Sequence, residues 1–386
     1  MTDKRNKLRV LFLNEALGGH TTVHHNLRVE LNNHPDIEPV FVDVPTAGLP
    51  RRVVGAALPI LGPHDADLQP VRAQYAAAAV ARSLLKQHAP TVDVCHVYTA
   101  NAGLLATDLL SQHPSVVTTD TTNVHNVKRL PYRKPTWATP VNLAAVKGRE
   151  REVYRACDKV VANSDWAAES MRRDYGIAND HIRLIRFGIT APHFATPAPG
   201  PAVTGPASPL PKVTFVGRQL ERKGALRLLR VHQEHFRDEC ELVLVTTEAV
   251  TPAPNVTVIS DVRPGDGRIW DALRESAVFA FPSDIDQAPN AVLEAMGAGV
   301  PVIAVNIAAQ AEMVQPGTTG LLIEPTDDEG LRRSLRRLLD DPEERIRMGA
   351  AGRQRMLDHY DMARSTAALV DLFHEVAASS PKVGAR

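Results

Sequence analysis

The chain has 386 residues, more than one ordinary hydrophobic core supports, so two domains are expected. Apolar residues make up 44% of it and charged residues 23%, which are typical of a folded globular protein and argue against disorder. Lys plus Arg and Asp plus Glu both number 44, and this balance excludes a general nucleic-acid binder, which normally carries a basic excess.

The cysteines and the apolar runs indicate the compartment of the protein and argue against a membrane-spanning segment. Three widely spaced cysteines, Cys95, Cys157 and Cys240, show no metal-ligand spacing and fit a reducing compartment. The longest apolar run, residues 53–62, contains a proline and is far shorter than the roughly 20 residues that span a bilayer. Residues 8–13 follow a basic start but lack the length and cleavage site of a secretory signal, so we interpret them as a first strand. A cytoplasmic protein is expected.

Short β-branched runs alternate with longer segments of helical period, which indicates β-α-β units and parallel sheets. Strands are expected at residues 8–14, 38–44, 92–99, 115–120, 159–164 and 182–188, and again at 213–218, 241–247, 256–261, 278–283, 302–306 and 320–324. Helices are expected at residues 71–88, 142–157 and 166–175, and through the tail from about residue 327.

A segment rich in Pro, Gly and Ala, residues 195–212, has the composition of a linker. We therefore expect a first domain at 1–194, joined by a C-terminal helix at 362–378, and a second domain at 213–361. Both are expected to be doubly wound, Rossmann-like α/β domains that face each other across a cleft. In such sheets ligands bind at the carboxyl ends of the strands.

The first candidate loop, Glu15 to His20, directly follows the first expected strand. Its paired glycines, Gly18 and Gly19, allow a sharp turn or a close approach to an anion at the next helix. A plain strand-to-helix turn explains the same residues equally well. His20 and His24 have the spacing of a metal pair, but without a third ligand we interpret this as chance.

The second candidate loop, residues 216–224, follows the first strand of the second domain. Arg218 is expected at the end of the strand and Lys223 at the entry to the next helix. Two cations in these places suit a diphosphate, although a solvated basic loop is the simpler interpretation.

The third candidate segment, residues 282–294, contains two carboxylates. Pro289 suits the opening of a helix, with Asp286 in the preceding loop and Glu294 inside the helix. We expect the carboxylates to reach one site from different depths, one at a sugar and one at a ribose diol. The alternatives are a partner for the helix dipole and a surface residue.

Together these segments resemble the retaining GT-B glycosyltransferases of family 4. The family's G-R-x-x-x-x-K-G pattern is present at residues 217–224, and its E-x7-E pattern appears as Asp286 and Glu294. Residues 301–325 and 160–189 are also similar to the family's sequences. The resemblance extends over essentially the whole chain and is strongest from 155 to 325.

The resemblance implies roles for the matched donor-side residues. Arg218 and Lys223 would hold the donor diphosphate, Glu294 the ribose hydroxyls, and Asp286 the transferred sugar. Further donor contacts are implied for Gly18, Gly19, Ala288 and Asn290. Expected catalytic residues are Arg218, Lys223, Asp286 and Asp120.

The sequence departs from the family's pattern at several positions. Asp286 replaces a glutamate, which shortens its reach by roughly 1.5 Å. Ala308 and Ala309 replace paired glycines, and Asn306 replaces an acid. The family's His-Asp pair at a first-domain strand end is Thr119-Asp120 here.

On the acceptor side we expect contacts from His20, Thr119 and His125, the latter two as substitutes for the missing histidine. The loop at 133–137, with its basic and aromatic residues, is a candidate for contact with a phosphorylated or glycan acceptor or with an anionic membrane surface. An ordinary surface loop explains the same residues equally well.

The expected reaction is transfer of a hexose-type sugar from a UDP- or GDP-sugar to a hydroxyl of a small-molecule, glycan or lipid-linked acceptor, with retention. The leaving diphosphate would be stabilised by fixed charges, so no protein nucleophile, obligatory cofactor or metal is expected. Alternatives are an enzyme of the same architecture with other chemistry, such as a sugar-nucleotide epimerase, and a binding module that retains nucleotide without turnover. Nothing in the sequence specifies the acceptor, the sugar or the oligomeric state.

Overall fold

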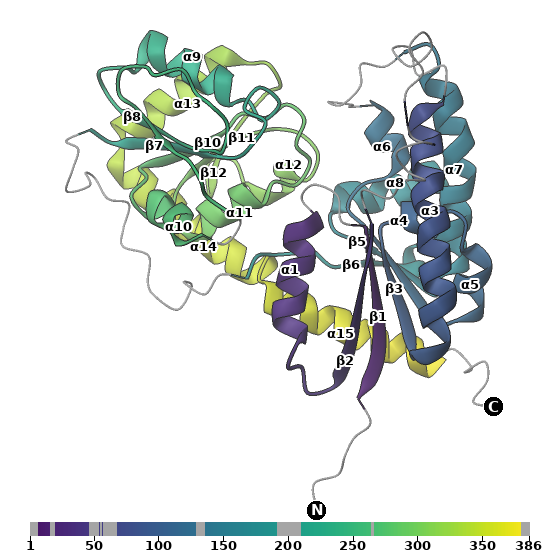
Figure 1. The fold of residues 1–386 in the computed structure, drawn as a ribbon. Helices are drawn as coiled ribbons and strands as arrows, with labels where there is room; N and C mark the ends of the chain where they lie inside the picture. Colours follow the sequence, from purple (N-terminus) through teal and green to yellow (C-terminus); the bar gives the residue numbers. More distant parts are fainter. Residues whose placement is uncertain are drawn as a thin grey trace, which may run out of the picture. The chain divides into compact units, whose positions relative to one another are not determined.

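A computed structural model describes residues 7–15, 20–45, 54, 56, 68–128, 136–190, 210–263 and 266–379. The chain divides into two compact units: unit 1 contains Met1–Phe187 and Met362–Arg386, and unit 2 contains Gly188–Asp361. Most of the expected linker lies outside the described residues. Each unit is built on its own six-stranded sheet (Figure 1).

The sheet of unit 1 is entirely parallel, in the order β2-β1-β3-β4-β5-β6. Its strands are β1 (Leu8–Glu15), β2 (Ile37–Val44), β3 (Val94–Tyr98), β4 (Ser115–Thr119), β5 (Lys159–Ala162) and β6 (Ile182–Leu184). Its α-helices are α1 (His20–Leu31), α3 (Gln69–His88), α4 (Ala100–Gly103), α5 (Thr107–Gln112), α6 (Asn123–Lys128), α7 (Thr139–Ala156), α8 (Asp165–Tyr175) and α15 (Met362–Ser379), and its short 3-10 helices are η2 (Ala89–Thr91) and η3 (Asn179–His181).

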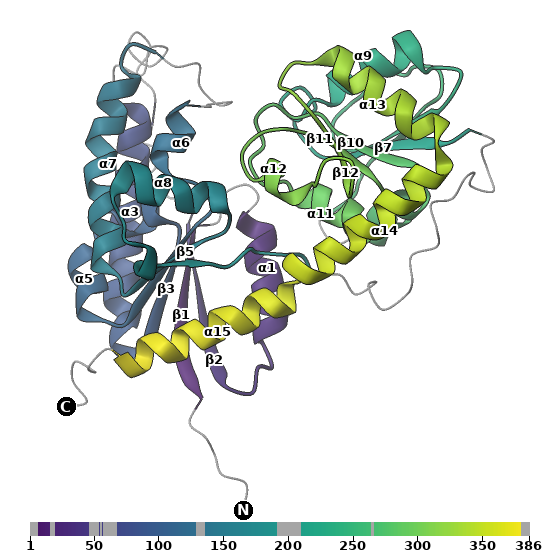
Figure 2. The same cartoon turned by 180° about the vertical axis from the view of Figure 1, so that it is seen from behind.

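Both faces of this sheet are covered, so unit 1 has two apolar layers. Helices α1 and α15 pack on one face, and α3, α4, α5, α7 and α8 form the layer on the other (Figures 1 and 2). The central strands are therefore buried from both sides, which explains why β1 and β3 read as nearly continuous apolar runs.

Unit 2 repeats the design with the order β12-β11-β10-β7-β8-β9. Its strands are β7 (Lys212–Val216), β8 (Glu241–Val245), β9 (Val256–Ile259), β10 (Val278–Phe281), β11 (Val302–Val305) and β12 (Gly320–Ile323). Its helices are α9 (Ala225–His235), α10 (Gly267–Arg274), α11 (Asn290–Gly297), α12 (Gln310–Met313), α13 (Asp328–Asp340) and α14 (Pro342–His359). Helices α9 and α13 lie on one face and α10, α11 and α14 on the other (Figure 2). The predicted class of two parallel α/β sheets is confirmed.

Two buried histidines make unit 1 sensitive to acid. His24 of α1 packs edge-on against Tyr98, and burial lowers its pKa to about 4. His96 of β3 is fully buried, and burial lowers its pKa to about 3. Both are neutral in the fold, so between their usual pKa and these lowered values the unfolded chain binds more protons than the folded one.

We therefore expect each histidine to lower the free energy of unfolding by about 2 kcal/mol between pH 7 and pH 5. Urea denaturation at the two pH values measures the change. His24→Leu should remove its own share, about 2 kcal/mol, from this pH dependence, whereas His25→Leu, at the exposed neighbour, should leave the pH dependence unchanged. Equal pH dependence in both variants would contradict the assignment.

Candidate functional site

The turn after β7 lies against the end of β10 because Gly224 has no side chain. Its φ is +80°, and a Cβ there would lie 2.1 Å from the carbonyl oxygen of Pro282. This close approach brings Lys223 to residues 283–287, a segment that we call the Asp286 loop. Loops after two non-consecutive strands thus meet at the carboxyl edge of the sheet, where open α/β sheets bind ligands.

Lys223 and Asp286 form an ion pair at this edge. Lys223 Nζ lies 3.2 Å from Asp286 Oδ2, and Arg222 Nη2 lies 3.8 Å from the same oxygen. Lys223 Nζ also lies 5.4 Å from the centre of the Phe281 ring. Both side chains of the pair are about four-fifths buried, so the charges are only partly screened by solvent.

Glu294 lies in α11, which begins three residues after the end of the Asp286 loop. Burial raises the pKa of Glu294 to about 7, against the opposing effect of the Lys223 charge. At the start of the helix Pro289 is the N-cap, Asn290 is half-buried, and Ala288 is exposed. The structure thus brings Lys223, Asp286 and Glu294 together, with Ala288 and Asn290 at the mouth of the helix.

Arg218 lies in the exposed part of the turn after β7. Among the described residues its side chain forms no ion pair or hydrogen bond, so its guanidinium is available to an anion. The turn itself is held by Glu248, whose carboxylate accepts hydrogen bonds from the backbone N–H of Gln219 and, at 3.1 Å, of Leu220. No sequence pattern pointed to Glu248, because it lies 29 residues from Gln219 along the chain.

Asp284 and Asp286 resemble a metal-binding D-x-D element in sequence only. Asp284 Oδ1 lies 3.2 Å from Arg227 Nη1 and accepts a bond from the N–H of Thr326 at 3.0 Å, whereas Asp286 pairs with Lys223. Across the described residues, no group of three or more His, Cys, Asp or Glu side chains lies close enough to hold a metal ion.

A second polar site occupies the carboxyl edge of unit 1. His20 Nε2 lies 3.1 Å from Asp120 Oδ2, and His20 Nδ1 lies 3.3 Å from the carbonyl oxygen of Glu15. Burial lowers the pKa of His20, but the opposing effects of Asp120 and Glu15 are together larger, so the pKa is raised. Conversely, burial raises the pKa of Asp120, but the contact with His20 and nearby backbone N–H groups together lower it, so each partner favours the charged form of the other.

The other two residues expected on the acceptor side, Thr119 and His125, are less exposed than His20 and Asp120. Thr119 is fully buried at the end of β4. His125 is also buried, and its ring stacks on Trp166 with centroids 3.7 Å apart. The structure therefore favours His20 with Asp120, rather than Thr119 or His125, as the groups that a ligand at this edge would meet.

Two other sequence predictions fall mainly outside the described residues. Gly18 and Gly19 are not described, and neither is most of the loop at 133–137. Trp137, the last residue of that loop, is 72% exposed.

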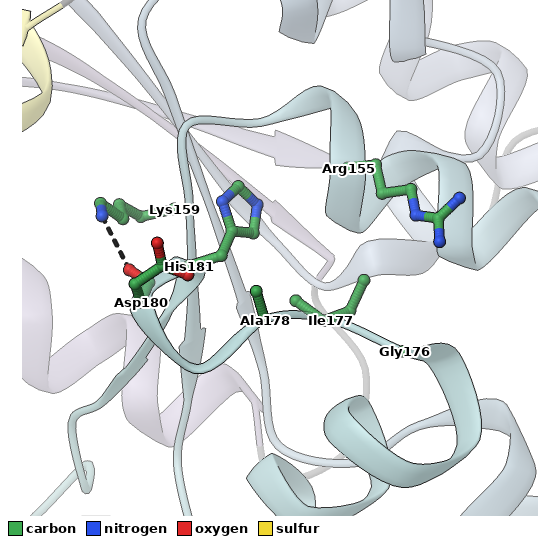
Figure 3. A pocket seen from close by; sticks show the side chains of 7 residues that line it. All are labelled: Arg155, Lys159, Gly176, Ile177, Ala178, Asp180 and His181. Atoms are coloured by element: carbon green, nitrogen blue, oxygen red, sulfur yellow. Dashed lines mark hydrogen bonds between the residues drawn. The ribbon is translucent and has the colours of Figure 1, made fainter.

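A separate hollow of about 320 Å³ lies at the opposite, amino edge of the unit 1 sheet (Figure 3). Several of its polar groups are already paired. Lys159 Nζ donates to the carbonyl oxygen of Asp180 at 2.8 Å, and His181 Nε2 lies 2.6 Å from the carbonyl oxygen of Tyr154. In Figure 3 Arg155 points away from these groups, so the hollow presents no convergent set of charges.

In the portion of the chain that the structure describes, no helix is both long enough and apolar enough to span a bilayer.

Two family models match the chain, one on each side of the expected linker. The model described as Glycosyltransferase Family 4 matches residues 17–191, and the model described as Glycosyl transferases group 1 matches residues 210–341. The second match contains Arg218, Lys223, Asp286 and Glu294.

Curated relatives are also glycosyltransferases. Alpha-maltose-1-phosphate synthase of Mycobacterium tuberculosis is 28% identical over 369 residues, which cover 87% of this chain and 91% of that protein. The synthase of Mycolicibacterium smegmatis is 27% identical over 256 residues, 59% of this chain and 66% of its own length. D-inositol 3-phosphate glycosyltransferase of Streptomyces avermitilis is 28% identical over 255 residues, 60% of this chain and 54% of that protein.

Solved structures share the fold at low sequence identity. Sucrose-phosphate synthase from Thermosynechococcus elongatus has a TM-score of 0.68 and 19% identity, and the match covers 97% of this chain and 100% of that chain. Anabaena HepE, solved in complex with UDP-glucose, has a TM-score of 0.63 and 14% identity, and the match covers 95% and 100% of the two chains.

Proposed function

The chain is a GT-B glycosyltransferase of the family 4, group 1 type, and we propose that it transfers a hexose from a UDP- or GDP-sugar to an acceptor hydroxyl with retention of configuration. The observation that carries the proposal is the contact between Lys223 and Asp286 beside Glu294, at the ligand-binding edge of unit 2. The UDP-glucose complex of the HepE neighbour supports a nucleotide-sugar donor.

In the proposed mechanism unit 2 stabilises the leaving diphosphate. Lys223 and Arg218 supply positive charge to the phosphates, and the N–H groups at the start of α11, from Asn290 onward, add to it. Glu294 accepts hydrogen bonds from the ribose hydroxyls. Asp286 contacts the hydroxyls of the transferred sugar, and Lys223 then exchanges its Asp286 partner for phosphate oxygen.

Unit 1 supplies the acceptor side of the proposal. The carboxylate of Asp120, held by His20, accepts a hydrogen bond from a sugar or acceptor hydroxyl. The acceptor oxygen attacks on the face from which the diphosphate leaves, and a phosphate oxygen takes its proton. This step needs no protein nucleophile and no metal ion.

We place the enzyme in the cytoplasm because its three cysteines are free and buried, which fits a reducing compartment.

Ligand-induced thermal shift tests the donor assignment. UDP-, GDP-, dTDP- and ADP-sugars are compared on the wild type, with and without magnesium. A ligand at 100 times its dissociation constant stabilises the fold by about 2.7 kcal/mol, which raises Tm by a few degrees. We expect a shift with one nucleotide class that does not depend on magnesium.

Product analysis then tests the stereochemistry. The anomeric proton coupling of the transferred sugar should match that of the donor. An inverted product would contradict retention, whereas binding without turnover on any acceptor would favour the binding module. No shift with any sugar nucleotide would overturn the proposed function.

A further inference from the structure

Gln310 contacts the Asp286 loop from a different part of the sequence. It is the first residue of α12, after β11, and its side chain is fully buried. Its Nε2 donates to the carbonyl oxygens of Ser283, at 3.3 Å, and of Asp286. Its backbone N–H donates to the carbonyl oxygen of Gln287 at 3.1 Å. One residue therefore binds three carbonyl groups of a five-residue loop.

These contacts require a side-chain nitrogen that carries at least two N–H donors, which the Gln310 amide supplies. Carbonyl oxygens only accept hydrogen bonds, and two of them meet one buried nitrogen, so the group must carry two N–H donors. An apolar side chain of the same size would leave both carbonyls without this donor, and a carboxylate would repel them.

The hydrogen bonds from Gln310 help to hold the backbone of Asp286 in place. The backbone N–H of Asp286 donates to Ser283 Oγ at 3.1 Å, and its carbonyl accepts from Gln310. With both of its backbone groups bound, the residue directs its carboxylate to Lys223, 3.2 Å away. Two further anchors of the loop do not involve Gln310: Arg227 and the N–H of Thr326 bind the side chain of Asp284, and Ser283 Oγ donates to the carbonyl oxygen of Arg222 at 3.2 Å.

We propose that Gln310 is a positioning residue that sets the place of the Asp286 carboxylate for its contact with the transferred sugar. The inference rests on the proposed function and deepens it: Gln310 touches no substrate and acts through the loop. It should therefore influence recognition of the sugar and leave recognition of the nucleoside diphosphate unchanged.

The test compares two ligands on each protein by calorimetry, beginning with UDP-glucose and UDP and continuing with the GDP-mannose and ADP-glucose pairs. Gln310→Met keeps the length of the side chain and removes its donors. We expect UDP-glucose, or the sugar nucleotide that the wild type prefers, to bind about tenfold more weakly, since two buried hydrogen bonds are lost. The free nucleotide should bind as in the wild type, which also shows that the variant is folded.

Gln233→Met is the matched control. Gln233 Nε2 also donates to a backbone carbonyl in unit 2, that of Pro254 at 2.9 Å, far from the Asp286 loop in sequence. Its loss should change neither affinity. Equal weakening of nucleotide and sugar nucleotide in Gln310→Met would overturn the proposal and assign Gln310 a general structural role.

A double-mutant cycle separates positioning from stability. In an Asp286→Ala background the carboxylate is absent, so Gln310→Met should cause no further loss of affinity for the sugar nucleotide, although it should still lower Tm. The same tenfold loss in both backgrounds would overturn the proposal.

A measurement made without ligand distinguishes failure of the positioning role of Gln310 from failure of the proposed function. Amide hydrogen exchange across residues 283–287 should accelerate at least tenfold in Gln310→Met and stay unchanged in Gln233→Met. Unchanged exchange would overturn the positioning role whatever binds. If the wild type binds none of the nucleotides, the proposed function fails, and the role in sugar recognition fails with it, even where the exchange result supports the structural contact.

Discussion

Lys223→Ala is expected to lower the rate of sugar transfer by a factor of about 10² to 10³. The lysine lies at the ligand-binding edge of unit 2, where it is about four-fifths buried and pairs with Asp286. In the proposed mechanism its charge opposes the negative charge that develops on the leaving diphosphate, and partial burial makes that interaction stronger than it would be in water. Steady-state kinetics with saturating donor measures the loss as a fall in kcat.

Lys212→Ala is the matched control for this substitution. Lys212 lies in the same unit at the start of β7, the strand whose far end leads to Lys223, and its Nζ pairs with Glu275 at 2.6 Å. It sits at the edge of the sheet opposite to the proposed site, so its loss should leave kcat within about twofold of the wild type. Equal effects of the two substitutions on kcat would show that the charge of Lys223 makes no specific contribution to the reaction.

The pH profile gives a second readout of the same variant. The Lys223 charge partly opposes the rise in the pKa of Glu294 that burial causes. Without the lysine, the pKa of Glu294 should rise above about 7, and more of the carboxyl should be protonated at neutral pH. Because the ionised form accepts the ribose hydroxyls, donor binding in Lys223→Ala should require a higher pH than in the wild type.

Local patterns predicted the strands and the loops at their carboxyl ends. Runs such as residues 213–216 are short, β-branched and bounded by glycine, so their assignment needs no long-range information. The meeting of Lys223 and Asp286 could also be predicted, because both lie in loops that follow strands of one sheet, whereas the roles of these residues and of Glu294 stay predictions.

Contacts between distant segments could not be predicted in the same way. His20 and Asp120 are 100 residues apart and meet only because β1 and β4 both flank β3 in the sheet. His125 lies near Asp120 in sequence, yet its ring turns to Trp166, since position along the chain does not fix the direction of a side chain. The role of Gln310 depends on two loops whose approach no single-sequence pattern encodes.

Gly224→Ala is expected to destabilise the protein by about 3 to 5 kcal/mol, a loss at the upper end of what single substitutions cause. The new Cβ would lie 2.1 Å from the oxygen and 2.5 Å from the carbon of the Pro282 carbonyl, and neither backbone atom can rotate away as a side chain would. The residue also has a φ of +80°, which adds strain for any side chain. Urea denaturation measures the loss.

Gly148→Ala is the control, and it should change the free energy of unfolding in the opposite direction. Gly148 lies within α7, is exposed, and a Cβ there would have no heavy atom within 4 Å. Alanine should therefore stabilise the helix by about 0.5 to 1 kcal/mol.

Comparison of the two glycine variants separates two effects on the free energy of unfolding. One is the effect of adding a side chain, and the other is the effect of pushing apart the loops that follow β7 and β10. Pro282 leads directly into the Asp286 loop, so a Gly224→Ala protein that remains folded must move either Lys223 or Asp286. It should then bind sugar nucleotide more weakly than its remaining stability alone would explain. Stability and donor affinity close to those of the wild type would mean that the approach of these loops is not what builds the site.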